Sequence, residues 1–374
     1  MRIAINAIFL VTGKGGGIER YLRGLLKGLA QIDRVNEYLV FGNKDNAGTF
    51  ELRDNFREIV SPVSARIRPA KILWEQFVLP SRLKKEKVDI VLSAGNIAPK
   101  IFFCPSLVII YDLIFFAHPE EFSLLERLVL RHLLHRTAMS ADRIITVSES
   151  SKNEIIRWLK VPQDRMSVVY GGCDKNLRDV IDTMVLKDKV IVKGNYIFCA
   201  ASLRMYKNLD GLIKAYSVLK KKYSVPQKLV LTGHKGRYYE ALQRLVRVLG
   251  LENDVIFTGF ISDNELRLLY SSADVFVFPS FYEGFGLPVL EAMASGTPVV
   301  ASNRTSIPEV VGDAGLLFNP DNTDEMAETI YSVLREETLK KSLVSRGFER
   351  VKKFTWEKTA EGVLKVINSA VKIG

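Results

Sequence analysis

The sequence contains little cysteine and no apolar run long enough to cross a membrane. It has three cysteines in 374 residues, Cys104, Cys173 and Cys199. Their wide spacing fits neither a disulfide framework nor a cysteine-based metal site. The most apolar stretch, residues 101–117, contains Pro105 and Asp112, whereas a membrane span needs roughly 20 predominantly apolar residues. We therefore interpret this stretch as a buried strand followed by a loop.

A secretory signal is also missing from the opening residues. Asn6 interrupts the first apolar run, and no small-residue cleavage site follows it. Together with the cysteine content, this predicts a protein of the reducing cytoplasm. The histidines show no metal-ligand spacing, so we expect neither a metal site nor a resident cofactor.

Negative charge is scarce relative to positive charge. The chain has 53 Lys and Arg against 42 Asp and Glu, a net charge of +11. A basic balance suggests polyanionic partners, such as nucleic acid, an anionic membrane surface or phosphate-rich small molecules. We do not expect nucleic acid, because no basic stripe is interleaved with aromatic residues.

The densest basic cluster ends a predicted helix in the first half of the chain. Its cations are Arg82, Lys84, Lys85 and Lys87. Cations at a helix C-terminus complement the helix dipole and are often simply solvated. The alternative is a contact with anionic lipid headgroups, which would place the protein peripherally at the inner face of the membrane.

Short β-branched runs alternate with longer helical patterns in two blocks, which stop and restart around residues 171–194. The expected strands are 3–8, 38–42, 88–92, 107–111, 143–147, 167–170, 196–200, 228–232, 254–258, 274–279 and 298–301. The expected helices include 18–32, 123–139, 150–159, 208–223, 238–249, 263–271, 288–294 and 354–373. The strands are apolar on both faces, as buried parallel strands are. The fold class is therefore α/β, with two Rossmann-like, doubly wound halves joined by a linker.

A glycine-rich loop, residues 13–17, separates the first strand from the first helix. Glycines let the backbone approach a ligand closely, and amides at a helix start can face an anion. The loop is not a P-loop, because no Gly-Lys-Ser/Thr ends it, and it lacks the dinucleotide-binding spacing. It is either a phosphate contact or a surface loop.

Two cations follow the strand expected at residues 196–200. Arg204 and Lys207 are three residues apart in a loop that precedes a helix. Ligands of doubly wound sheets bind outside the carboxyl ends of the strands, and cations there can neutralise a phosphate leaving group. Taken alone, two basic loop residues are more often solvated.

The most specific segment runs from Glu283 to Glu291, with the sequence EGFGLPVLE. Pro288 suits the first position of a helix, which would put Glu291 in the first turn. The two carboxylates then flank the amides of a Gly-Phe-Gly turn, an arrangement suited to sugar hydroxyls and phosphate oxygens. Helix-dipole complementation explains Glu291 alone but not the whole arrangement.

Together these motifs resemble family 4 of the retaining glycosyltransferases. The motifs in chain order are 16–20, 141–149, 204–208, 283–291 and 354–357. The resemblance covers nearly the whole chain and implies the GT-B architecture: two Rossmann-like domains, a cleft between them, and a C-terminal helix that crosses back to the first. The implied boundaries are 1–172 plus 355–374 for the acceptor-side domain, 173–195 for a linker, and 196–354 for the donor-binding domain.

The resemblance implies transfer of a hexose from a nucleoside-diphosphate sugar, with front-face attack and no metal. Arg204 and Lys207 would hold the diphosphate, and Glu283 would contact the transferred sugar. Glu291 would bind the ribose hydroxyls. The other implied donor contacts are Gly16, Gly17, Phe260, Gly284, Phe285, Gly286 and Leu287.

One departure concerns the acceptor side. The family often has a histidine where this chain has Tyr111, and the following Asp112 matches the family's aspartate. Asp112 would orient the acceptor or act as a base, or else cap the loop at a strand end. His118 lies nearby in the sequence and would either enter the site or be structural.

Residues 73–80, LWEQFVLP, resemble the subgroup that acts on bacterial surface polysaccharides, often with mannose donors. A glycan or lipid-linked saccharide is then the expected acceptor, with Trp74 either stacking on a sugar or lying in the core. Two other function classes stay open. One is a nucleotide-sugar epimerase of the same architecture, and the other is a non-enzymatic binding module for anionic polymers.

Overall fold

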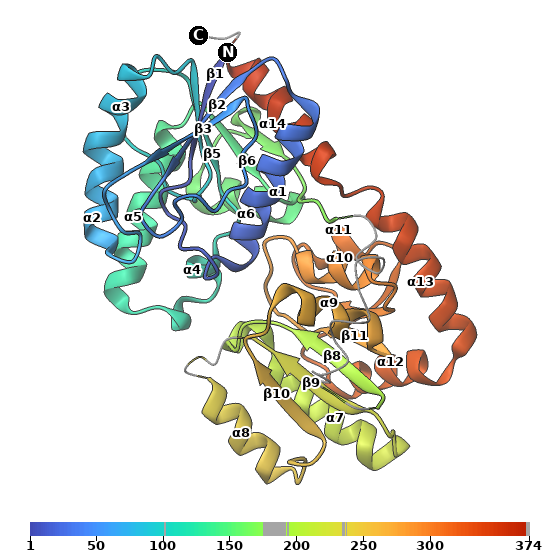
Figure 1. The fold of residues 1–374 in the computed structure, drawn as a ribbon. Coiled ribbons are helices and arrows are strands. Elements are labelled where there is room, and N and C mark those ends of the chain that lie inside the picture. Colours follow the sequence, from blue (N-terminus) through green and yellow to red (C-terminus); the bar gives the residue numbers. More distant parts are fainter. Residues whose placement is uncertain (101, 175–191, 193, 234–235, 237, 372–374) are drawn as a thin grey trace. The chain divides into compact units, whose positions relative to one another are not determined.

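The computed structural model describes residues 1–100, 102–174, 192, 194–233, 236 and 238–371. The chain divides into two compact units, residues 1–172 with 355–374, and residues 173–354. Most of the predicted linker, 173–195, lies outside the described residues. In Figure 1 the chain runs from blue to red, and its last helix returns to the unit that holds the blue N-terminus.

Unit 1 is built on a seven-stranded parallel sheet with the order β3-β2-β1-β4-β5-β6-β7. Its strands are β1 (Arg2–Asn6), β2 (Glu37–Gly42), β3 (Phe56–Val60), β4 (Ile90–Ser93), β5 (Ser106–Ile109), β6 (Arg143–Thr146) and β7 (Met166–Val168). Helices cover both faces of the sheet, with α1 and α14 on one side and α2, α3 and α5 on the other in Figure 1. The strand order reverses at β1 and β4, which makes this point the topological switch of the sheet.

The helices of unit 1 differ in length and packing. They are α1 (Gly16–Ile32), α2 (Arg68–Leu73), the π-helical turn η1 (Trp74–Val78), α3 (Leu79–Lys85), α4 (Ile114–Ala117), α5 (Leu124–Ser140), α6 (Glu149–Leu159) and α14 (Trp356–Val371). Two glycines of α1 let α14 approach closely. A Cβ on Gly24 would lie 2.2 Å from the indole ring of Trp356, and one on Gly28 would lie 2.2 Å from the Trp356 carbonyl oxygen. The final helix is thereby packed against the first helix of unit 1.

Unit 2 has a six-stranded parallel sheet with the order β10-β9-β8-β11-β12-β13. Its strands are β8 (Tyr196–Ala200), β9 (Lys228–Thr232), β10 (Val255–Gly259), β11 (Val275–Phe278), β12 (Val299–Ser302) and β13 (Gly315–Phe318). Its helices are α7 (Leu209–Tyr223), α8 (Tyr239–Val248), α9 (Asp263–Ser272), α10 (Leu287–Ala294), α11 (Ile307–Val311), α12 (Thr323–Arg335) and α13 (Glu337–Val351). The order reverses between β8 and β11, so the loops that follow these two strands leave the sheet side by side.

The structure confirms the predicted α/β class with two parallel sheets and adds elements that the sequence pattern did not reveal. Strand β3 was missed because it is an edge strand with exposed polar residues in the sequence FREIV, not an apolar run. Strand β13 was also missed, and it is an edge strand of the unit 2 sheet. The first helix begins at Gly16, two residues before the predicted start.

Candidate active site

The switch point of unit 2 brings Lys207 and Glu283 together. Their ammonium nitrogen Nζ and carboxylate oxygen Oε1 are 2.5 Å apart, and each side chain is 12% exposed. Lys207 ends the 3₁₀ turn after β8, and Glu283 lies in the loop after β11. These residues are 76 positions apart in the chain, and the two predicted motifs therefore form one site.

The Lys207 loop is tied to the end of β11 by Asn208. This residue has a left-handed backbone, φ 53°, and its side-chain amide donates to the carbonyl oxygens of Pro279, at 3.2 Å, and Pro320, at 2.9 Å. Gly211 makes room for it, because a Cβ there would lie 2.2 Å from the Asn208 Oδ1 atom. Asn208 thus fixes the position of Lys207 relative to the Glu283 loop. Arg204 is exposed on the same loop.

The buried side chain of Ser306 holds the Glu283 loop through two backbone carbonyl groups. The Ser306 hydroxyl lies 2.9 Å from the carbonyl oxygen of Glu283 and 2.8 Å from that of Phe285. The Glu283 N–H donates to the hydroxyl of Thr305 at 3.1 Å. Gly286, with φ 118°, then turns the chain into α10 with a backbone that favours glycine. The contacts with Ser306 and Thr305 thus help to set the shape of the loop.

Helix α10 begins at Leu287, which corrects two details of the sequence analysis. Pro288 is the second helical residue, not the first, and the first turn holds no acidic residue. The prediction that Glu291 lies in the first turn is therefore wrong, and the helix dipole does not explain this glutamate. Its Oε2 atom accepts a hydrogen bond from the hydroxyl of Tyr270 at 3.0 Å.

The remaining predicted donor contacts differ in exposure. Phe260 follows β10 and is 65% exposed, whereas Phe285 is buried, with its ring 5.9 Å from that of Phe354. Gly284 is half-buried, and Gly286 and Leu287 are buried at the start of α10. Phe260 can therefore offer a ligand its ring, whereas the residues at the start of α10 can offer their backbone more readily than a side chain.

A free thiol lies beneath the Lys207–Glu283 pair. Cys199 is on the central strand β8, and burial raises the pKa of its thiol to about 12, against the opposing effect of Lys207. The thiol is protonated at neutral pH and has no nucleophilic character there.

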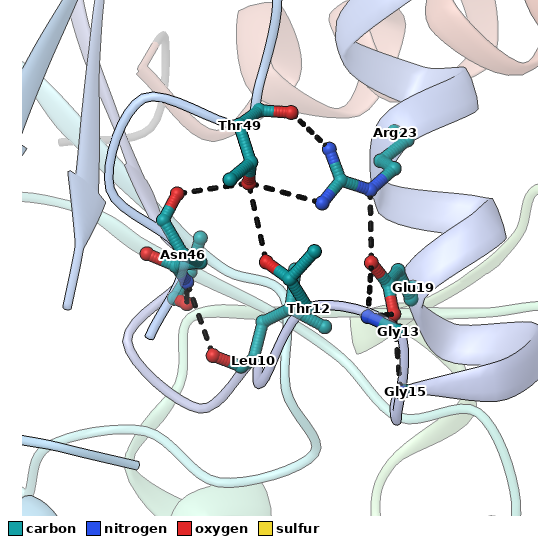
Figure 2. Close-up of polar contacts among 9 residues, drawn as sticks. Leu10, Thr12, Gly13, Gly15, Glu19, Arg23, Asn46 and Thr49 are labelled. Atoms are coloured by element: carbon teal, nitrogen blue, oxygen red, sulfur yellow. Dashed lines mark hydrogen bonds and ion pairs between the residues drawn. The ribbon is translucent and has the colours of Figure 1, made fainter. Parts of the chain in front are cut away.

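In unit 1 the glycine-rich loop is held by a carboxylate that the sequence analysis gave no role. Figure 2 shows that Glu19 accepts hydrogen bonds from the backbone N–H groups of Gly13, at 3.0 Å, and Gly15, at 3.1 Å. Gly16 and Gly17 are the first two residues of α1, whose N–H groups have no partner within the helix. The two predicted phosphate contacts therefore stand at the amino end of a helix.

The predicted acceptor residues of unit 1 have local partners. The Oδ1 atom of Asp112 accepts from the N–H of Ile114 at 3.1 Å and so shapes the turn before α4. His118 Nδ1 lies 2.9 Å from a carboxylate oxygen of Glu120. Tyr111, which stands where the family often has a histidine, is buried, and its hydroxyl donates to the Ala94 carbonyl oxygen at 3.0 Å.

Trp74 belongs to the core, which is the alternative to sugar stacking that the sequence left open. It is 9% exposed and packs with apolar residues of β1, β2 and α3. Its ring is consequently covered by protein. The next residue, Glu75, is also buried, and burial raises the pKa of its carboxyl group despite the nearby Lys71.

The basic cluster lies at the end of α3. Arg82, Lys84 and Lys85 fall in the last turn and are exposed, and the Lys84 ammonium stands 5.2 Å from the centre of the Phe103 ring. Among the described residues, no helix combines the length and the apolar character that crossing a bilayer requires.

Comparisons with known proteins agree with this architecture. Residues 15–177 match the sequence profile "Glycosyltransferase Family 4", and residues 182–350 match "Glycosyl transferases group 1". The fold resembles that of Anabaena HepE, solved in complex with UDP and glucose, with a TM-score of 0.74 at 24% identity, over 99% of this chain and 100% of that one. The GT-B class is thus confirmed.

Curated relatives identify the chain as a glycosyltransferase. The chain is 35% identical to O-antigen chain mannosyltransferase B of Escherichia coli over 75% of this chain and 69% of that protein. It is 31% identical to O-antigen chain mannosyltransferase RfbU of Salmonella typhimurium, over 86% of this chain and 88% of that protein. With its motifs in order and both sheets doubly wound, the chain belongs to family 4 of the glycosyltransferases.

Proposed function

We propose that this glycosyltransferase transfers mannose, with retention of configuration and without a metal, from a nucleoside-diphosphate sugar to a polysaccharide or lipid-linked saccharide. The Lys207–Glu283 pair at the switch point of unit 2 carries the proposal, because it sets a cation and a hydrogen-bond acceptor side by side where doubly wound sheets bind ligands. The mannose donor and the glycan acceptor are supported by the names of the two relatives. A nucleotide donor is supported by the UDP and glucose of HepE.

In the proposed reaction, the bond from the sugar C1 to the diphosphate oxygen breaks as the acceptor oxygen bonds to C1 on the same face. The acceptor proton passes to the departing phosphate oxygen. Lys207 and Arg204 would neutralise the charge that develops on this phosphate, which gives protein cations the role that a metal has in other transferases. The amides at the start of α10 would add the favourable field of a helix N-terminus.

The two carboxylates of unit 2 would bind sugar hydroxyls. Glu283 would accept from the transferred hexose, since its loop is held by Ser306 and its charge is balanced by Lys207. Glu291, oriented by the Tyr270 hydroxyl, would accept from the ribose. The exposed ring of Phe260 would contact the base.

Unit 1 would supply Gly16 and Gly17 to the donor phosphates and Asp112 to the acceptor. Asp112 already shapes a turn through one oxygen, so we propose that it orients the acceptor. His118 would be a weaker acceptor contact, because Glu120 engages its ring.

A thermal-shift screen followed by a transfer assay tests the proposal. GDP, UDP and their hexose conjugates are added to the purified protein, and stabilisation should rise with ligand concentration over the dissociation constant. The stabilising donor is then incubated with a mannose-terminated oligosaccharide, with and without EDTA, and the new linkage is assigned by NMR. An α-linked product that forms equally well in EDTA supports the proposal.

Other outcomes separate the alternatives. A β-linked product from an α-linked donor would contradict retention, and a loss of activity in EDTA that added metal restores would contradict metal independence. Conversion of the sugar without an acceptor would identify an epimerase. A protein stabilised by polyanions in a salt-dependent manner, but by no nucleotide, would be a binding module.

We also propose that unit 1 contacts an anionic membrane surface. The exposed cations of α3 are accompanied by exposed leucines on α5, namely Leu124, Leu125 and Leu128, which are 65%, 72% and 59% exposed. An interfacial helix carries both kinds of side chain, and here we propose that two helices, α3 and α5, supply them. Vesicles of phosphatidylglycerol should bind the protein at low salt and release it at high salt, and the change Leu125→Ser should weaken the binding. Equal binding to neutral phosphatidylcholine vesicles, or none to either, would overturn this proposal.

A further inference from the structure

We propose that Glu19 is a positioning residue for the donor. Its carboxylate holds the turn at Gly13–Gly15 in the shape that directs the N–H groups of Gly16 and Gly17 toward a phosphate. The inference rests on the proposed function, because it assumes that a nucleoside diphosphate reaches these two glycines.

The carboxylate of Glu19 serves the backbone. Its side chain is 10% exposed, and both of its oxygens lie within hydrogen-bond distance of the Gly13 N–H, while Oε2 also accepts from the Gly15 N–H. Hydrogen bonds to a charged acceptor are roughly twice as strong as neutral ones. A single side chain in the first turn of α1 therefore fixes the turn that leads into the helix.

A second residue of α1 holds the carboxylate itself. Arg23 Nε donates to Glu19 Oε1 at 3.0 Å, and the same guanidinium reaches the carbonyl oxygen and the hydroxyl of Thr49. Figure 2 shows this chain of contacts, in which Thr49 also lies 3.2 Å from the hydroxyl of Thr12. The arrangement links the glycine-rich loop to the loop after β2, and Arg23 balances the negative charge that would otherwise repel a phosphate.

Asparagine side chains hold the carbonyl groups of the same loop. Asn43 donates to the carbonyl oxygens of Ile8 and Leu10 at 2.7 and 2.8 Å, and Asn46 donates to that of Ala7 at 3.0 Å. Both asparagines are fully buried. The loop between β1 and α1 therefore has side-chain partners on its carbonyl and amide groups, which is the preorganisation that ligand binding requires.

Two glycines of the loop, Gly15 and Gly17, differ in what an added side chain would meet. Gly15 has no room for a side chain, because a Cβ there would lie 2.6 Å from the Glu19 Cβ atom. A Cβ on Gly17 would meet nothing within 4 Å, and its φ is negative. Alanine would suit a helix better at this position. Folding thus explains Gly15 but not Gly17, whereas a close backbone contact with a ligand explains Gly17.

The test compares Glu19→Gln with Asp142→Asn. Asp142 is the matched control, because its carboxylate also accepts from a backbone N–H, that of Ser106 at 2.8 Å, at the amino ends of β5 and β6, where no ligand contact is proposed. Glutamine keeps the size of the side chain at position 19, but it has one acceptor oxygen. That oxygen can replace either Oε2, which accepts from Gly13 and Gly15, or Oε1, which accepts from Arg23, and the NH₂ group then faces a donor. Calorimetry measures the affinity for GDP, GMP, UDP and UMP, and the transfer assay gives KM for donor and acceptor.

We expect Glu19→Gln to lower the affinity for the matching diphosphate and to raise the donor KM by roughly tenfold, the value of a hydrogen bond to a charged group. The affinity for the monophosphate and the acceptor KM should change less than about twofold on the same scale. Asp142→Asn should leave all four quantities unchanged. A donor KM that is unchanged in a folded Glu19→Gln protein overturns the inference, as does an equal rise in donor and acceptor KM.

Two further variants keep the result interpretable. Should Glu19→Gln not fold, Thr49→Val removes the hydroxyl beside Arg23 and should raise the donor KM about threefold, a fraction of one hydrogen bond; no rise would overturn the inference. Gly17→Ala separates this inference from the proposed function, since its methyl group should obstruct the phosphate whatever holds the loop. If Gly17→Ala binds GDP and UDP normally, the proposed phosphate contact fails. If Gly17→Ala weakens binding and Glu19→Gln does not, the positioning role of Glu19 is refuted, and the proposed phosphate contact stands.

Discussion

The two units place different chemistry at the same topological position. Both sheets reverse their strand order next to the central strand, at β1 and β4 in unit 1 and at β8 and β11 in unit 2. In unit 2 the loops at this point bring together two side chains, Lys207 and Glu283. In unit 1 the corresponding loop is rich in glycine, and the carboxylate of Glu19 on α1 holds the N–H groups of Gly13 and Gly15.

This difference shows which changes should affect binding and which should affect shape. A side chain at the unit 2 switch can be removed while Asn208 and Ser306 still hold their loops. A change in the first helix of unit 1 alters the packing or the backbone. Side-chain loss in unit 2 should thus reduce chemistry, whereas atoms added at the contact between α1 and α14 in unit 1 should reduce stability.

The largest effect is expected from Lys207→Ala. Removing the cation from the proposed leaving group should lower kcat/KM by about 100-fold or more, the usual cost of losing one preorganised electrostatic contact. It also leaves Glu283 without its partner in a site where each side chain is 12% exposed, which should lower the free energy of unfolding. Steady-state kinetics and thermal unfolding measure the two effects separately.

Lys222→Ala is the matched control in the same unit. Its ammonium lies 3.1 Å from Glu328, but both side chains are more than half exposed, so the pair contributes little. Activity and melting temperature should stay at the wild-type values. A Lys207→Ala enzyme that retained full activity would refute the division between the two units, because the unit 2 pair would then be purely structural.

The next largest effect is expected from Gly24→Ala in unit 1. The added Cβ would lie 2.2 Å from the buried indole of Trp356, so α14 must shift away from α1. Overpacking of this kind costs about 1–3 kcal/mol in the free energy of unfolding. Thermal and urea unfolding should show the loss, while Gly17→Ala, where a Cβ meets nothing, should show none. Equal stability of the two variants would mean that α14 is not closely packed on α1.

The sequence was sufficient for most of the fold because buried parallel strands carry a strong signal. Runs such as those of β1, β8 and β11 are apolar on both faces and are followed by helical patterns. Strand β3 escaped detection because Arg57 and Glu58 interrupt its apolar pattern. Strand β13, with the sequence GLLF, is an apolar run of only four residues, which periodicity cannot tell from a buried helix segment.

The site was predictable only in part, because motifs reveal residue types but not partners. Lys207 and Glu283 could be named from their motifs, yet nothing in the sequence states that they touch. Glu19 was visible within a motif but its role was missed, since hydrogen bonds to backbone N–H groups leave no pattern. The misplacement of Glu291 came from Pro288, which occupies the second helical position as readily as the first.

A smaller effect is expected from Glu75→Gln, which tests a carboxylate of unit 1 in the core. Burial raises the pKa of Glu75 above its usual value of 4.5, although Lys71 and Asn6 oppose the shift. The folded protein therefore keeps a proton that the unfolded chain releases as the pH rises above 4.5. By linkage, the free energy of unfolding should fall with pH across this window.

Glutamine cannot ionise, so the Glu75→Gln protein should lack this fall. The stability difference between variant and wild type should move in favour of the variant as the pH rises from 4.5 to 8. Urea unfolding at several pH values measures it. Parallel curves for the two proteins would show that Lys71 fully compensates the buried charge.

The smallest effect is expected from Phe260→Ala, which asks whether unit 2 also uses an exposed ring. The ring is 65% exposed, so its loss should change the free energy of unfolding by no more than about 0.5 kcal/mol. If it stacks on the base, the affinity for the nucleoside diphosphate should fall about fivefold, the low end for one base–aromatic contact. The exposed Val248, changed to alanine on α8, is the control for surface truncation. Because stacking acts on the base and Gly17 is proposed to act on the phosphates, Phe260→Ala should weaken GMP or UMP binding as much as that of the diphosphate. A loss of affinity confined to the diphosphate would show that Phe260 acts on the phosphates. No side chain would then be assigned to recognition of the base.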